Sequence, residues 1–247
     1  PCCGTGNLMI ALMSMYKNPW ETITHHILLC DVDATAIIVA KTLLTILYAP
    51  HDHNVSSDDI SSYTGDFLSD GIIINKNDVI IMNPPYGRCD DHNEYETYDI
   101  HDMYAMFMEK AALSHAFVSI TPQSFIGSLK FEKLRDILSM HRTTDIIAYD
   151  NVPGTIFNGR KHGVFNTNES NSVRAAITVS LESPDDCGIR STPMLRWRNS
   201  ERDDAIHAYP RIITGIPYEN HTKHAIPKCP STTQWLLDIP HDITLGQ

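Results

Sequence analysis

The sequence lacks any apolar run approaching the ~18 to 20 residues that a membrane span requires. It also lacks a charged segment followed by an apolar stretch at its start, the pattern of a secretion signal. Its six cysteines form no C-x-x-C pair and no regular spacing, which argues against a disulfide framework and a structural zinc site. These absences predict a protein of a reducing, cytoplasmic setting, with no membrane partner and no metal.

Basic residues are also few. Nineteen Lys and Arg stand against thirty Asp and Glu, a formal net charge of −11, which argues against binding nucleic acid through bulk charge alone. Twelve Gly and fourteen Pro exclude collagen-like and low-complexity classes, and the 42% apolar fraction is enough for a substantial core. The length of 247 residues predicts one large domain, or one full domain and a remainder.

Short apolar runs alternate with helical patterns along most of the chain. The expected strands cover residues 27–30, 78–82, 116–120, 145–149 and 173–181. The expected helices cover residues 34–47, 104–113 and 131–140, the first of them apolar nearly all round, as in a helix buried between layers. This alternation predicts βαβ units and an α/β fold with a mostly parallel sheet. From about residue 183 the pattern dissolves, and we predict a boundary there.

The first candidate site is the segment Pro1-Cys2-Cys3-Gly4-Thr5-Gly6-Asn7, which leads into an apolar stretch. A Gly-x-Gly loop that opens a helix lets a ligand approach the backbone closely. The third Gly of the dinucleotide-binding pattern is absent. A tight turn before a helix is the alternative interpretation.

The second candidate is Asp31, at the end of the first expected strand. In open α/β sheets an acidic residue at this place can bind ribose hydroxyls. Alternatively, Asp31 or Asp33 simply caps the next helix, and both roles are compatible.

The third candidate, Asn83-Pro84-Pro85-Tyr86, follows a buried strand directly. Two prolines fix the backbone there and can aim the Asn amide oxygen and a free carbonyl at one point. Two such acceptors suit a ligand amino group, and the Tyr ring offers a stacking surface for a flat base. A Pro-rich turn at a strand end is the structural alternative. Residues 89–92 are expected to form a loop after this motif, mobile and closing over substrate.

Residues 1–7, 30–33, 65–68 and 83–86 together resemble, in this order, the motif series of S-adenosylmethionine-dependent adenine-N6 DNA methyltransferases. The group with cofactor motifs ahead of the Asn-Pro-Pro-Tyr motif, as in type IIG restriction-modification enzymes, is the most similar. Residues 104–110, 120–125 and 152–157 resemble its later segments, so the likeness spans about residues 1–182. It implies a Rossmann-like class I methyltransferase fold with helices on both faces of the sheet, S-adenosyl-L-methionine as cofactor and DNA as partner, in a restriction-modification or phage-type methylase.

The resemblance also implies a role for each matched residue. The implied cofactor-binding residues are Pro1, Cys3, Gly4, Thr5, Gly6, Asp31, Val32, Asp66, Phe67, Tyr104 and Phe107. In this set the glycine loop would wrap the methionine part, Asp31 would hold the ribose, and Asp66 would accept from the adenine amino group. The implied catalytic residues are Asn83, Pro84, Pro85 and Tyr86. Tyr86 and Phe157 would stack on the target base, although Phe165 could replace Phe157, and core packing is the alternative for both Phe residues.

These roles predict a mechanism. The amine of adenine is a poor nucleophile because its lone pair is delocalised into the ring. If Asn83 Oδ1 and the Pro84 carbonyl accept its two N–H groups, the lone pair turns toward the sulfonium methyl, and transfer needs no strong base. The base must leave the duplex for this to happen.

The family pattern carries an acidic residue and a strand just before the position of Pro1, and that strand lies inside the sheet. Both are absent here, so we expect the first strand of the sheet to be missing and a larger parent enzyme to supply the upstream segment and the target-recognition domain. Residues 183–247 are then a linker or the start of a DNA-recognition region.

Two other functions stay open. The same Asn-Pro-Pro-Tyr acceptors serve methyltransferases of RNA or of a protein glutamine, although residues 121–125 favour adenine. A non-catalytic methylase-like module is the second, and the intact Asn83, Pro84 and Tyr86 count against it.

Overall fold

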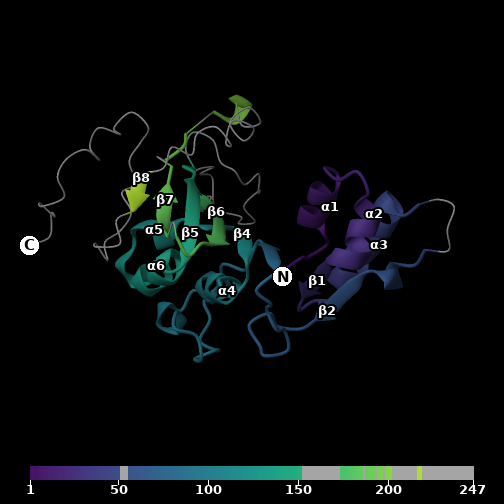
Figure 1. The fold of residues 1–247 in the computed structure, drawn as a ribbon, viewed down its shortest axis with the longest axis horizontal. Helices are drawn as coiled ribbons and strands as arrows, with labels where there is room; N and C mark the ends of the chain where they lie inside the picture. Colours follow the sequence, from purple (N-terminus) through teal and green to yellow (C-terminus); the bar gives the residue numbers. More distant parts are fainter. Residues whose placement is uncertain are drawn as a thin grey trace, which may run out of the picture.

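The computed structural model describes residues 1–50, 55–151, 173–185, 187–192, 194–196 and 198–201, and the backbone of residues 216–218. Within these residues the strands form two sheets that share no pairing, one with two strands and one with six. Figure 1 shows the two sheets with their helices next to one another and the N-terminus between them. None of the helices described is long and apolar enough to cross a membrane.

The smaller sheet consists of β1 (Leu28–Asp31) and β2 (Ser61–Thr64), which run parallel. Helices α1 (Asn7–Met13) and α2 (Pro19–His26) precede β1, and α3 (Ala34–Tyr48) connects the two strands. The buried core of this part consists of Met13, Ile23, Leu29, Ala40, Leu44 and Ile60. In this structure α3 is covered on one face only, because Ile38, Ile46 and Leu47 are exposed, so the expectation of a helix buried all round is wrong for the described residues.

The larger sheet follows in the chain. Its strands are β3 (Val79–Met82), β4 (Ala116–Pro122), β5 (Arg142–Ala148), β6 (Ala175–Glu182), β7 (Gly188–Ser191) and β8 (Ile216–Tyr218). Its helices are α4 (Met103–Ala111), α5 (Ser124–Gly127) and α6 (Glu132–Ser139). Short 3-10 turns lie at Ser57–Asp59, Tyr98–Ile100, Leu129–Phe131 and Asn199–Glu201.

The strand order of the larger sheet is β3-β4-β6-β5-β7-β8. Strands β3, β4, β5 and β7 run in one direction, and β6 and β8 run in the other. The predicted α/β class with a mostly parallel sheet is therefore confirmed. Because parallel strands end at the same edge, the polar residues after β3 and β4 lie together, as do those after β1 and β2.

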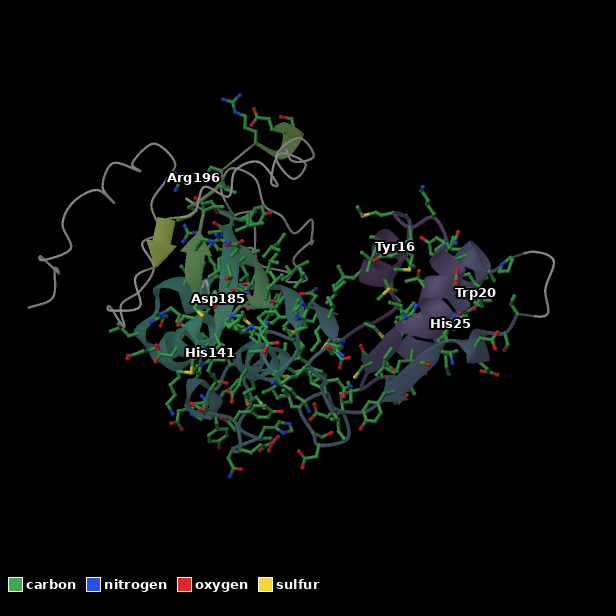
Figure 2. The ribbon with its side chains drawn as sticks, viewed as in Figure 1. Tyr16, Trp20, His25, His141, Asp185 and Arg196 are labelled. Carbon is green, nitrogen blue, oxygen red and sulfur yellow. The ribbon has the colours of Figure 1, made fainter. Side chains whose placement is uncertain are left out.

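The expected strands and helices all appear, with ends shifted by a few residues; β5, for example, begins at Arg142 rather than at Asp145. The sequence reasoning missed α2, α5, β2, β7 and β8. The larger sheet also continues past the predicted boundary at residue 182, because β7 pairs with β5. The division of the chain into domains stays a prediction. Figure 2 shows Arg196, beyond β7, near the end of this sheet.

Candidate functional site

A tight loop joins the start of the chain to α1. Cys2, Gly4 and Gly6 adopt positive φ angles of 53°, 49° and 87°. A Cβ at Gly6 would lie 3.1 Å from the Cβ of Ala40, so the loop packs closely on α3 and a side chain there would crowd that helix. A Cβ at Gly4 would meet no atom within 4 Å, so the backbone of Gly4 borders open space that a ligand can enter.

Asp31, at the end of β1, holds this loop in place. Its Oδ2 accepts a hydrogen bond from the Gly4 backbone N–H at 2.8 Å, and its Oδ1 accepts one from the Asp33 N–H at 3.0 Å. The cap of α3 is instead Asp33, whose Oδ1 accepts from the Thr35 N–H at 2.8 Å. A carboxylate oxygen can accept two hydrogen bonds and each oxygen of Asp31 accepts one here, so Asp31 keeps acceptor capacity for a ribose hydroxyl.

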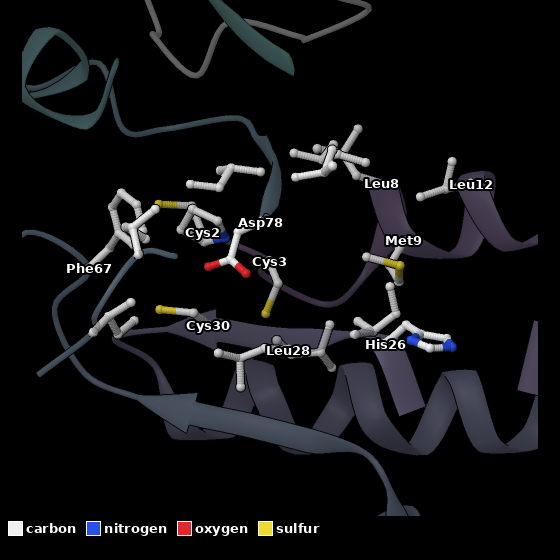
Figure 3. A pocket seen from close by; sticks show the side chains of 18 of the residues that line it. Cys2, Cys3, Leu8, Met9, Leu12, His26, Leu28, Cys30, Phe67 and Asp78 are labelled. Carbon is white, nitrogen blue, oxygen red and sulfur yellow. The ribbon is translucent and has the colours of Figure 1, made fainter. Parts of the chain in front are cut away.

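A cleft of about 610 Å³ lies between β1 and β3. Figure 3 shows Cys2, Cys30 and Phe67 at one end of it, and Leu12 and His26 toward the other. Of the implied cofactor residues, the lining includes Pro1, Cys3 and Phe67. Asp31, Asp66, Tyr104 and Phe107 are not in the lining.

Three thiols gather at the loop end of the cleft. Burial raises the pKa of Cys2 to about 12 and that of Cys3 to about 11, and it also raises the pKa of Cys30. The three side chains are therefore neutral thiols at neutral pH rather than thiolate nucleophiles or ligands. Among the described residues, no group of three or more His, Cys, Asp and Glu side chains is arranged to hold a metal ion.

Asp66 and Phe67 lie just after β2, beside the end of β1. The Gly65 N–H donates to the Asp31 carbonyl at 2.9 Å, which ties the two strand ends together. The ring of Phe67 is 3% exposed and stacks on Phe107, with the centroids 5.2 Å apart. Asp66 thus offers a partly exposed carboxylate next to an apolar wall, an arrangement that suits the amino group of a flat ring.

Tyr104 and Phe107 are buried residues of α4, and neither of them lines the cleft. Tyr104 is 2% exposed, its hydroxyl lies 2.7 Å from Ser124 Oγ, and its ring stacks on Phe131. Burial raises the pKa of Tyr104. The Phe107 ring stacks on Phe67, and Phe67 in turn lines the cleft. Their implied contact with the cofactor stays a prediction.

The Asn-Pro-Pro-Tyr segment begins where β3 ends. Asn83 is exposed and Pro84 is buried, so the amide faces solvent while the turn is fixed in the core. The Tyr86 hydroxyl lies 2.6 Å from Asn83 Oδ1 and 3.1 Å from the Ile120 carbonyl on β4. Burial raises the pKa of Tyr86 to about 12, so this hydroxyl stays protonated and donates.

The other residues implied by the resemblance are placed as follows. Val32 is 70% exposed beside the glycine loop, where a flat ring could cover it. Thr5 and Pro85 are exposed. Phe157 and Phe165 lie outside the described residues.

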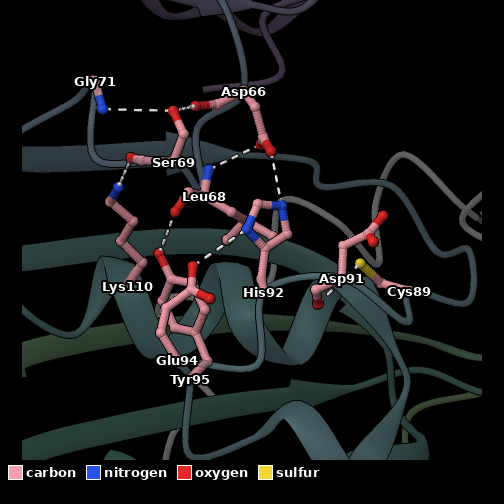
Figure 4. Close-up of polar contacts among 10 residues, drawn as sticks. All are labelled: Asp66, Leu68, Ser69, Gly71, Cys89, Asp91, His92, Glu94, Tyr95 and Lys110. Atoms are coloured by element: carbon pink, nitrogen blue, oxygen red, sulfur yellow. Dashed lines mark hydrogen bonds and ion pairs between the residues drawn. The ribbon is translucent and has the colours of Figure 1, made fainter.

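The sequence reasoning missed a set of contacts that residues 88–102 and Lys110 make with the turn after β2. His92 Nε2 lies 2.8 Å from Asp66 Oδ2, and the Tyr95 hydroxyl donates to the Leu68 carbonyl at 2.6 Å. The nearly buried Lys110 donates to the Ser69 carbonyl at 2.6 Å, and burial lowers its pKa. Figure 4 shows these contacts. No motif links the partners, because they lie far apart in the sequence.

Among solved structures, the DrdV–DNA complex matches with a TM-score of 0.71 at 16% identity, over 91% of this chain and 27% of that chain. A protein from Listeria monocytogenes described as a class I S-adenosylmethionine-dependent methyltransferase matches with a TM-score of 0.52 at 15% sequence identity. The match covers 84% of this chain and 60% of that protein. A type I restriction-modification methyltransferase subunit from Streptococcus thermophilus matches with a TM-score of 0.52 at 12% sequence identity. The match covers 84% of this chain and 46% of that subunit. These likenesses confirm the class I methyltransferase fold.

The chain thus spans less than two thirds of each of these three structures. No curated protein matches it. The model of the family Eco57I restriction-modification methylase matches residues 25–155, from the end of α2 through β5 and a few residues beyond. Because this match covers more than half of the 247 residues, the chain belongs to the Eco57I restriction-modification methylase family.

Proposed function

We propose that this chain carries the site that transfers a methyl group from S-adenosylmethionine to the N6 amine of an adenine flipped out of DNA. The observation that carries the proposal is the exposed Asn83 amide at the end of β3, next to the fixed backbone of Pro84. Family membership supports it, because restriction-modification methylases act on DNA. The proposed setting is the cytoplasm, in keeping with free thiols at Cys2, Cys3 and Cys30.

The residues at the ends of β1 and β2 fit the cofactor. Gly4 borders open space, Asp31 has acceptor capacity left over, and Asp66 carries a partly exposed carboxylate. We assign the ribose hydroxyls to Asp31 and the adenine amine to Asp66, with Val32 and Phe67 as the apolar surroundings. The glycine loop, including Cys3 and Thr5, would border the methionine part. When bound, the cofactor supplies an electrophilic methyl group on a sulfonium.

Asn83 and Pro84 would orient the target amine. Asn83 Oδ1 and the Pro84 carbonyl accept its two N–H groups, which directs the nitrogen lone pair away from both acceptors and toward the methyl group. Alignment of this kind supplies several kcal/mol of a barrier, on the order of 7 to 11 in the best cases. The fixed acceptors also stabilise the positive charge that develops on the nitrogen. Pro85 keeps the turn rigid, and the Tyr86 ring stacks on the extruded base.

The test is transfer of a labelled methyl group by the full chain to duplex DNA, RNA and a glutamine-containing peptide. We expect label in DNA, and Asn83→Ala should lower the rate at least about a hundredfold with cofactor affinity unchanged. Asn93→Ala, at an exposed amide in the neighbouring loop, is the matched control and should keep full activity. Label in RNA or peptide alone, or full activity of Asn83→Ala, would overturn the proposal.

A further inference from the structure

The loop between Tyr86 and α4 reaches back to the turn after β2 through one histidine. His92 Nε2 lies 2.8 Å from Asp66 Oδ2, and its Nδ1 lies 3.2 Å from Glu94 Oε1. Only 21% of the His92 side chain is exposed. Because a carboxylate only accepts, the contact with Asp66 requires a proton on Nε2. Figure 4 shows the ring between the two acidic side chains.

The backbone of His92 is held in an unfavourable conformation. Its φ angle is 68°, in the left-handed region that residues other than Gly uncommonly adopt. Such a conformation persists only where the surroundings enforce it. The contacts made by this ring therefore offset local strain.

Other contacts hold the same loop without touching Asp66. The Glu109 carboxylate on α4 accepts from the backbone N–H groups of Glu96 and Thr97, both at 2.9 Å. The Tyr95 hydroxyl donates to the Leu68 carbonyl. The loop thus has anchors of its own and does not depend on the contact between His92 and Asp66 alone.

Asp66 has two constraints in this structure. Its Oδ1 accepts from the Leu68 N–H at 2.9 Å, and its Oδ2 accepts from His92. Together these bonds fix the plane of the carboxylate, while 40% of the side chain remains exposed to a ligand. A fixed acceptor loses less conformational freedom on binding than a rotating one.

We propose that His92 is a positioning residue that fixes the Asp66 carboxylate for the adenine amine of the cofactor and so sets the preference for an adenine over a purine without that amine. This inference rests on the proposed function, which assigns the amine to Asp66. Because His92 belongs to the loop after the Asn-Pro-Pro-Tyr segment, the same contact ties the cofactor side of the site to the target side.

The test measures binding of two ligands to the full chain by calorimetry. One is S-adenosylhomocysteine, and the other is S-inosylhomocysteine, in which a carbonyl replaces the amine. His92→Asn tolerates the left-handed backbone but is too short to reach Asp66. We expect it to weaken S-adenosylhomocysteine roughly five- to twentyfold and S-inosylhomocysteine less than about twofold.

Two further variants separate positioning from loop structure. His92→Gln places an amide N–H near the position of Nε2 and should restore most of the affinity for S-adenosylhomocysteine. Tyr98→Phe removes a hydrogen bond to the Asp90 carbonyl within the same loop, away from the turn that holds Asp66, and should leave both affinities unchanged. Equal losses for the two ligands in His92→Asn, or no loss for either, would overturn the inference. A wild-type chain that binds neither ligand would instead refute the proposed function, and the inference with it.

Discussion

Substitutions of two neighbouring aspartates, Asp31 and Asp33, distinguish a role in cofactor binding from a role in helix capping. Both lie between β1 and α3, and each accepts backbone hydrogen bonds. We predict that Asp31→Ala weakens S-adenosylmethionine binding strongly and that Asp33→Ala does not. The reason is that only Asp31 faces the glycine loop, whereas Asp33 caps the helix.

The expected magnitudes follow from the hydrogen bonds lost. Asp31 accepts two backbone N–H groups, and hydrogen bonds to a charged acceptor are worth about 1.5 kcal/mol each at the lower end, the appropriate figure for a half-exposed group. Asp31→Ala should therefore lower the unfolding free energy by about 2–3 kcal/mol. Loss of two comparable bonds to the ribose should weaken the cofactor about 30- to 150-fold. Asp33→Ala should cost about 1 kcal/mol of stability, the usual value of a helix cap.

The assay combines calorimetric titration of the cofactor with thermal unfolding of each variant. Asp31→Asn keeps one acceptor for the Gly4 N–H, so it preserves more of the fold and tests the charge. The reasoning is refuted if Asp31→Ala lowers the melting temperature but leaves cofactor affinity unchanged. It is refuted equally if Asp33→Ala weakens the cofactor as much as Asp31→Ala does.

Two further predictions concern a hydroxyl and a buried carboxylate. Tyr86→Phe keeps the ring but removes the hydroxyl that donates to Asn83 Oδ1, so methyl transfer should slow by about three- to tenfold. Tyr86→Ala also removes the ring and should slow methyl transfer far more. Equal losses of rate in the two variants would contradict the stacking role. Burial acts to raise the pKa of Asp150, but hydrogen bonds from Arg174, the Asn151 N–H and Arg196 outweigh it and hold the pKa below its usual value. The stability that Asp150 contributes is therefore present above the usual carboxyl pKa of about 4 and is lost as the pH falls through its lowered value. Denaturant midpoints measured against pH should fall more steeply below about pH 4 in the wild type than in Asp150→Asn, and parallel curves would contradict this.

The best-predicted parts of the site are the strand ends. Both β1 and β3 are short apolar runs that stop at a polar residue, Asp31 or Asn83, and this abrupt change is legible in the sequence. The missed strand β2 has the sequence Ser-Ser-Tyr-Thr and is largely exposed. Its residues do not alternate between apolar and polar, so nothing in them indicates a buried face. β7 was missed because it is only four residues long and includes a single apolar residue, Ile189.

The contacts of His92 and Lys110 could not be predicted for a different reason. Asp66 and His92 meet across the fold, and a polar loop has no hydrophobic period that would indicate which partner each side chain finds. Phe67 shows the same limit from the other direction. The motif implies a residue against the cofactor ring, while the structure shows the Phe67 ring buried, stacked on Phe107 and with the Lys110 ammonium 5.3 Å from its centroid. Tertiary packing determines which neighbours such a ring contacts, and the pattern of a single sequence does not reveal them.

The described structure divides the proposed chemistry between two sheets that share no strand pairing. Asp31 and Asp66 follow strands of the smaller sheet, and Asn83 follows a strand of the larger one. Methyl transfer requires the two sides to be held within an ångström or so of a productive alignment. In the described residues, the contacts that join the sides include the stacking of Phe67 on Phe107 and the hydrogen bonds of residues 88–102 and Lys110 with the turn that contains Asp66. Under the proposed roles, this loop would help to set the distance between the bound cofactor and the target base.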